Sequence, residues 1–116
     1  MRAQITLGLR QGYSGPRIAP DDVIDFLMAE VTGEVSEGRC WLPWQVTDSR
    51  LVYVHENKVF NEPSLVLSTD RNVHRNGLSE GEWKVLVEGV ARRLKGRFAQ
   101  DAVFVTYIPH ASIVIV

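Results

Sequence analysis

The sequence predicts an α+β fold of the ferredoxin-like type, an open-faced sandwich with two helices on one face of an antiparallel sheet and an extra hairpin strand. The length of 116 residues, 45% of them hydrophobic, corresponds to a single domain over residues 1–116. Periodic segments follow one another as strand, helix, two or three strands, helix, strand. Two helices can cover only one face of a sheet, and the split βαβ arrangement is the simplest topology with this order.

The first strand and the first helix are separated by a loop. Residues 5–10 alternate between apolar and small or polar side chains, which is typical of a half-buried strand. Two glycines and two prolines within residues 12–20 predict a loop. The first helix is expected to begin near Pro20-Asp21-Asp22, because proline suits a first helical turn and acidic residues suit the positive end of a helix, and Gly33 is the expected stop.

Residues 39–70 have an interrupted strand pattern. Pro43 restricts its segment to a sheet edge, a bulge or a bend. We expect a hairpin turn at 47–50 and a connection at 56–62. These separate three strand-like runs: Cys40–Val46, Leu51–His55 and Pro63–Thr69.

The second helix is the strongest feature of the sequence. Ser79 and Glu82 have the spacing of a capping box. Apolar residues then recur at helical spacing over about five turns: Trp83, Leu86, Val87, Val90, Leu94 and Phe98. A last strand is expected over Ala102–Ile108, and residues 112–116 extend or follow it.

Composition excludes several classes of function. Thirteen basic and fourteen acidic residues give a net charge of −1, which argues against a dedicated binder of nucleic acid or of a membrane surface. No apolar run is long enough to span a membrane, and residues 1–6 lack the core of a signal peptide, so we expect a cytoplasmic protein. The single cysteine, Cys40, excludes a disulfide within the chain and a cysteine-based zinc cluster.

The last strands are apolar on both alternating faces, which is typical of strands buried on both sides. Because the two helices cover one face only, we expect a homodimer to cover the other. The alternative is that the C-terminal segment folds back over the sheet.

Several short landmarks carry a family resemblance. They are Gly8-Leu9 at the end of the first strand, Glu30-Val31-Thr32, Trp44, Glu62 with Ser64, and Arg97-Phe98-x-Gln100-x-x-Val103 before the last strand. With them the chain resembles a bacterial domain-of-unknown-function family of small ferredoxin-like domains, often found in secreted or lipoprotein contexts. It departs from that family at Gly33-Glu34-Val35, where a proline and a basic-aromatic pair are usual, and in lacking an export signal. The resemblance implies the fold and no catalytic residues.

The polar loop over residues 70–77 is the main candidate binding site. Arg71, His74 and Arg75 precede a helix N-terminus, where exposed N–H groups and guanidinium groups favour a carboxylate or phosphate. No phosphate-loop or dinucleotide glycine pattern is present, so no cofactor is expected. The alternative is an ordinary solvated loop.

The remaining candidates for a metal site, a nucleophile or a ligand-binding surface have weaker support from the sequence. The histidines, His55, His74 and His110, lack metal-ligand spacing, so no metal site is expected. Cys40 is expected to be a buried structural thiol. Trp41, Trp44 and Tyr53 are expected to pack in the core or in a dimer interface; the alternative is a ligand-facing or base-stacking surface on the sheet.

The sequence therefore predicts a homodimeric binding or interaction module that takes a small anionic ligand at Arg71, His74 and Arg75. One alternative is a small dimeric enzyme with His55 or His74 as acid or base in a pocket between helices and sheet. Another is an accessory protein of a mobile element or phage that binds a host protein through its sheet.

Overall fold

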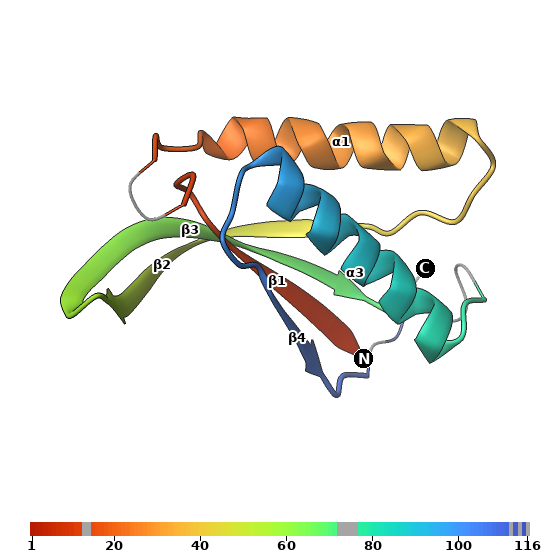
Figure 1. Cartoon of the computed structure of the whole chain (residues 1–116). Coiled ribbons are helices and arrows are strands. Elements are labelled where there is room, and N and C mark those ends of the chain that lie inside the picture. Colours follow the sequence, from red (N-terminus) through yellow and green to blue (C-terminus); the bar gives the residue numbers. More distant parts are fainter. Residues whose placement is uncertain (13–14, 72–76, 112, 114, 116) are drawn as a thin grey trace.

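A computed structural model of the chain describes residues 1–12, 15–71, 77–111, 113 and 115. The elements in chain order are β1 (Arg2–Gly8), α1 (Pro20–Ser36), β2 (Gln45–His55), β3 (Lys58–Asp70), α3 (Glu80–Arg97) and β4 (Phe104–Ile108). The strands form one antiparallel sheet in the order β2-β3-β1-β4. Figure 1 shows both helices on the same side of this sheet. The predicted α+β, ferredoxin-like architecture is confirmed.

The alternation of β1 divides the sheet into two faces. Ala3, Ile5 and Leu7 are fully buried against the helices. Their neighbours Gln4, Thr6 and Gly8 point to the opposite side, which we call the open face. The helix-facing layer is a continuous apolar core that includes Leu65, Leu67, Val23, Leu27, Trp83, Val87 and Leu94. No helix within the described residues is long and apolar enough to cross a membrane.

The hairpin of β2 and β3 corrects the expected strand pattern. The two strands turn at Glu56 and Asn57, both with positive φ (50° and 61°), in a two-residue turn that matches the twist of a hairpin. The expected turn at 47–50 lies inside β2, and the expected extra hairpin strand is not a separate strand of the described sheet. Polar residues are tolerated at 47–50 because β2 is an edge strand. Residues 40–44 are irregular, so most of the expected strand at 40–46 is absent.

Half of this hairpin extends beyond the rest of the sheet. The pairing of β1 with β3 ends at Gly8 opposite Ser64. Residues 50–55 and 58–63 therefore continue as a two-stranded segment, which we call the ribbon, and Figure 1 shows it projecting past β1. Pro63 still pairs with the segment that follows β1: the Leu9 N–H donates to the Pro63 carbonyl at 3.0 Å, and the Leu9 carbonyl accepts from Ile18, so the missing N–H of Pro63 leaves no acceptor unpaired.

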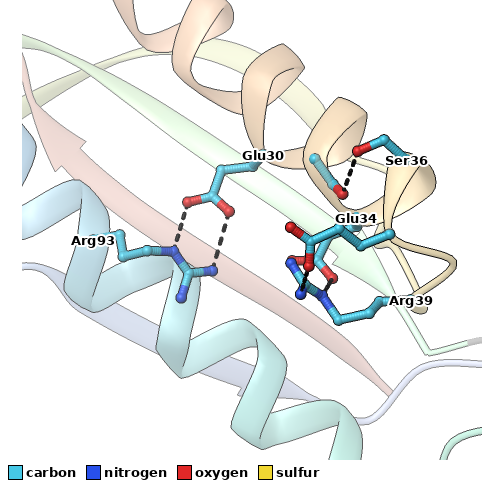
Figure 2. A network of polar contacts seen from close by, with 7 residues as sticks. Glu30, Glu34, Ser36, Arg39 and Arg93 are labelled. Carbon is cyan, nitrogen blue, oxygen red and sulfur yellow. Dashed lines mark hydrogen bonds and ion pairs between the residues drawn. The ribbon is translucent and has the colours of Figure 1, made fainter.

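Helix α1 continues past its expected stop. Gly33 lies inside the helix, which ends at Ser36, and the Ser36 hydroxyl donates to the Gly33 carbonyl at 3.0 Å. Figure 2 shows the contacts around this end: Arg39 returns to Glu34 at 2.8 Å, and Glu30 faces Arg93 of α3 with contacts of 2.6 and 3.2 Å. The Glu30–Arg93 pair joins the two helices outside the core.

Helix α3 has a specific capping motif at each end. The predicted capping box is confirmed, since Ser79 and Glu82 exchange hydrogen bonds of 3.1 and 3.2 Å. At the other end Ala99 has a φ of 50°, and the N–H groups of Ala99 and Gln100 donate to the carbonyls of Gly96 and Lys95. This is a Schellman cap, and it sets the position of Gln100 relative to β1.

The last strand is covered on one face only. Val105 and Tyr107 are half-buried toward the helices, whereas 66% of Phe104 is exposed on the open face. Residues 113 and 115 belong to no strand, while residues 112, 114 and 116 lie outside the described part of the chain. Within one chain, burial on both faces is therefore not observed for β4.

Replacing Ala99 with glycine should stabilise the protein. The left-handed conformation costs an L-residue about 1–2 kcal/mol, and glycine avoids this cost while losing about 0.5–1 kcal/mol more backbone entropy on folding. We expect Ala99→Gly to raise the free energy of unfolding in urea by about 0.5–1 kcal/mol. Ala29→Gly, at an exposed position inside α1, should lower it by about 1 kcal/mol. A loss of stability in Ala99→Gly would contradict the assigned cap.

Candidate active site on the open face

A cavity of about 200 Å³ lies on the open face, on the opposite side of the sheet from the helices. β1, the ribbon, β4 and the segment that joins α3 to β4 contribute to it. Its lining comprises Thr6, Gly8, Arg10, Gly12, Leu51, Tyr53, Glu62, Gln100, Asp101, Ala102 and Phe104. The cavity therefore collects residues from both ends of the sequence.

Glu62 places a carboxylate against the floor of this cavity. Only 9% of its surface is exposed. A Cβ atom added to Gly8 would lie 2.6 Å from Glu62 Oε1, which is closer than atoms can approach. Glycine at position 8 thus leaves the space that the carboxylate occupies.

The Glu62 carboxylate is incompletely satisfied by the protein. Its Oε2 atom is buried and has no hydrogen-bond partner within the described residues, and the same holds for the hydroxyl of the neighbouring Ser64. Buried polar atoms normally have partners, because an unsatisfied one costs about 1–3 kcal/mol. A carboxylate that lines a cavity and keeps one buried oxygen unpaired is suited to stabilise a cation in that cavity through its charge.

Aromatic rings flank the carboxylate. Tyr53 lines the cavity from β2 and stacks on Phe60 of β3, with ring centroids 5.3 Å apart and planes 12° apart. Phe104 contributes a second ring from β4. Ring faces are favourable neighbours for cations and for flat heterocycles.

The end of the cavity nearest α3 carries two opposite charges, those of Arg10 and Asp101. Gln100 precedes Asp101 and donates from Nε2 to the Arg10 carbonyl at 2.6 Å and to the Phe98 carbonyl at 3.3 Å. The Schellman cap thereby joins this end of the cavity to β1.

Comparison with solved structures finds two similar chains. A phage SAM lyase in complex with S-methyl-5'-thioadenosine aligns with a TM-score of 0.66 and 21% identity, covering 90% of this chain and 76% of that one. A phage SAM lyase in the apo state gives a TM-score of 0.68 and 21% identity, covering 90% and 75%. The fold resembles that of a phage SAM lyase. No protein-family model and no curated protein match the chain, so the resemblance to the bacterial family of unknown function stays a prediction.

The predicted anion site is only partly described. Arg71 is half-buried, and its guanidinium donates to the Leu78 carbonyl at 3.2 and 3.1 Å, so it joins the described segments on either side of residues 72–76. His74 and Arg75 lie outside the described residues. Binding of an anionic ligand at this loop stays a prediction.

The described histidines lie at opposite ends of the sheet. His55 ends β2 at the tip of the ribbon, 3.8 Å from Glu56. His110 follows β4 and lies 3.6 Å from Asp70 and 3.3 Å from Arg2. Neither lines the open-face cavity. The described residues contain no group of three or more side chains that could hold a metal ion.

Other expectations for single residues are corrected. Cys40 is exposed and belongs to no strand, because its segment is irregular before β2. Trp41 is 41% exposed, whereas Trp44 packs partly buried against the core. The enzyme alternative placed its pocket between helices and sheet; a cavity does lie between α1 and the start of β2, neither described histidine lines it, and this alternative stays a prediction.

Sequence reasoning missed the role of Glu62 because it assigned residues 56–62 to a connection. One signal was available. Phe60, Glu62, Ser64 and Val66 alternate on one face of β3, and an acidic residue in such a series marks a charged group directed at the sheet surface.

We expect the Glu62 carboxylate to contribute to ligand binding while lowering the stability of the fold. We expect Glu62→Met, an unbranched apolar side chain, to raise the free energy of unfolding in urea by about 1 kcal/mol, because it removes an unsatisfied buried carboxylate. Glu56→Met, where the side chain is 84% exposed, should change it by less than about 0.5 kcal/mol. A large loss of stability in Glu62→Met alone would show that the carboxylate supports the fold.

Proposed function

We propose that the open-face cavity binds a small molecule with a positive charge, and that the Glu62 carboxylate is its electrostatic anchor. The observation that carries this proposal is that Glu62 lines the cavity while its Oε2 atom is buried beside it and has no hydrogen-bond partner among the described residues. A burial of this kind costs stability, and a bound cation would compensate for it.

We propose a nucleoside sulfonium of the S-adenosylmethionine class as the ligand. Its sulfonium is a permanent cation suited to a carboxylate with aromatic neighbours, which Glu62, Tyr53 and Phe104 supply. Its adenine is a flat ring suited to the same aromatic surface. The similarity of the fold to a phage SAM lyase solved with S-methyl-5'-thioadenosine supports this choice.

Isothermal titration with S-adenosylmethionine tests the proposal. We expect Glu62→Gln to weaken binding about tenfold or more through loss of the charge, and Gly8→Ala to do the same by displacing the carboxylate. Gly33→Ala is the matched control, because no atom lies within 4 Å of the added Cβ. Unchanged affinity in both site variants, with their folding verified by circular dichroism, would overturn the role of Glu62. No binding to the original chain would overturn the ligand class.

A lyase activity is the second candidate, favoured by a carboxylate that could act as a base beside the ligand. In such an elimination the carboxylate takes a proton from the carbon next to the one bonded to sulfur, the C–S bond breaks, and the sulfur leaves with the bonding electrons as S-methyl-5'-thioadenosine while the amino-acid part is released with a C=C bond. Chromatography of the same mixtures should then show S-methyl-5'-thioadenosine, and Glu62→Gln should abolish its formation. Binding without product would leave a binding module.

We retain the homodimer as a proposal. Exposed apolar side chains support it: Phe104 at 66% on the open face, and Val52 at 70%, Val54 at 67% and Val59 at 75% on the other face of the ribbon. Light scattering after size exclusion should give twice the 13.1 kDa of the chain. A mass equal to one chain would contradict it. The phage or mobile-element accessory role also stays a prediction.

A further inference from the structure

Two opposite charges at one end of the open-face cavity have no evident structural task. Arg10 lies two residues past the end of β1 and Asp101 follows the cap of α3, and both line the cavity. Among the described residues, neither forms an ion pair within 4.0 Å, with the other or with any third side chain. Exposed charges of opposite sign contribute little to stability, so their joint position calls for another explanation.

The backbone around these two residues is fixed by specific contacts. Gln100 donates to the Arg10 carbonyl at 2.6 Å, and the Schellman cap holds Gln100 itself. A Cβ atom at Gly12, where φ is 63°, would lie 3.4 Å from Asp101 Oδ2, so the carboxylate lies against the loop that follows β1. The two charges are therefore carried by segments in contact with each other.

The charges of the cavity have a definite pattern. Glu62 and Asp101 supply two carboxylates, and Arg10 supplies one guanidinium. Their complement is a ligand with two positive groups and one negative group. A sulfonium attached to an amino acid has this pattern, because the sulfonium and the ammonium are positive and the carboxylate is negative.

We propose that Arg10 and Asp101 form a subsite for the amino-acid part of the ligand, in which Arg10 binds the α-carboxylate and Asp101 binds the α-ammonium group. Arginine suits a carboxylate because its N–H groups match the two oxygens. This inference rests on the proposed function and deepens it, since it assigns the selection between ligands with and without the amino-acid part.

Three ligands separate the contribution of the sulfonium to binding from that of the amino-acid part. S-Adenosylmethionine carries the sulfonium and the amino acid, and S-adenosylhomocysteine carries the amino acid with a neutral sulfur. S-methyl-5'-thioadenosine lacks the amino acid and also has a neutral sulfur. Their dissociation constants are measured by titration calorimetry on the original chain and on Arg10→Gln, Asp101→Asn and Glu62→Gln. Arg17→Gln is the matched control for Arg10→Gln, because Arg17 bridges to Arg10 through the backbone, is exposed, and does not line the cavity.

We expect Arg10→Gln and Asp101→Asn each to weaken S-adenosylhomocysteine about tenfold and to leave S-methyl-5'-thioadenosine unchanged. Glu62→Gln should weaken S-adenosylmethionine much more than S-adenosylhomocysteine. Arg17→Gln should alter none of the three by more than about twofold.

The subsite would be overturned if Arg10→Gln weakened the binding of S-adenosylhomocysteine and of S-methyl-5'-thioadenosine equally, or weakened neither. Either result would leave the proposed function in place. Failure of all three probes to bind the original chain would overturn the proposed function and the subsite together.

Discussion

Helices α1 and α3 bury one face of the sheet, and the open face has no comparable cover within the described chain. The core residues of β1 and β3 all point to the helices, as Ile5, Leu7, Leu65 and Leu67 do. On the open face the strands carry small and polar residues near their centre and apolar ones on the ribbon and β4. A surface of this kind is not needed for the stability of a two-layer fold, and it is where the candidate site lies.

The site depends on one close approach. Gly8 leaves space for the Glu62 carboxylate, and the end of β1 at this point allows the ribbon to continue alone and carry Tyr53 beside it. The buried oxygen of Glu62 has a cost in free energy that a purely structural residue would not impose. Natural proteins retain residues that lower stability in this way mainly at functional sites. The proposed ligand, with a permanent cation, would offset this cost on binding.

Local signals allowed much of the fold to be predicted from the sequence. The capping box at Ser79, the helical spacing of α3 and the alternation of β1 depend on neighbours a few residues apart, and each matches the structure. The predicted position of the hairpin turn was wrong. The polar residues at 47–50 have the composition of a turn, whereas the actual turn at Glu56-Asn57 lacks the usual glycine.

The candidate site was not predicted, for a different reason. Glu62, Gly8 and Asp101 are far apart in the sequence, and only strand pairing brings them together. The sequence drew attention to Arg71, whose guanidinium the structure shows bound to the Leu78 carbonyl. The Arg97-Phe98-x-Gln100 run, read as a family landmark, acquires a physical explanation as a helix cap that holds one end of the cavity.

An amide NMR titration with S-adenosylmethionine tests the central claim most directly, because it locates the bound cationic ligand without any substitution. Our account predicts saturable shifts at Thr6, Gly8, Gly12 and Gln100, which line the open-face cavity, with little change along the exposed side of α1. Shifts confined to α1, or to the residues that flank the loop at 72–76, would place the ligand elsewhere and contradict the account. Absence of any shift at millimolar ligand would contradict it as well.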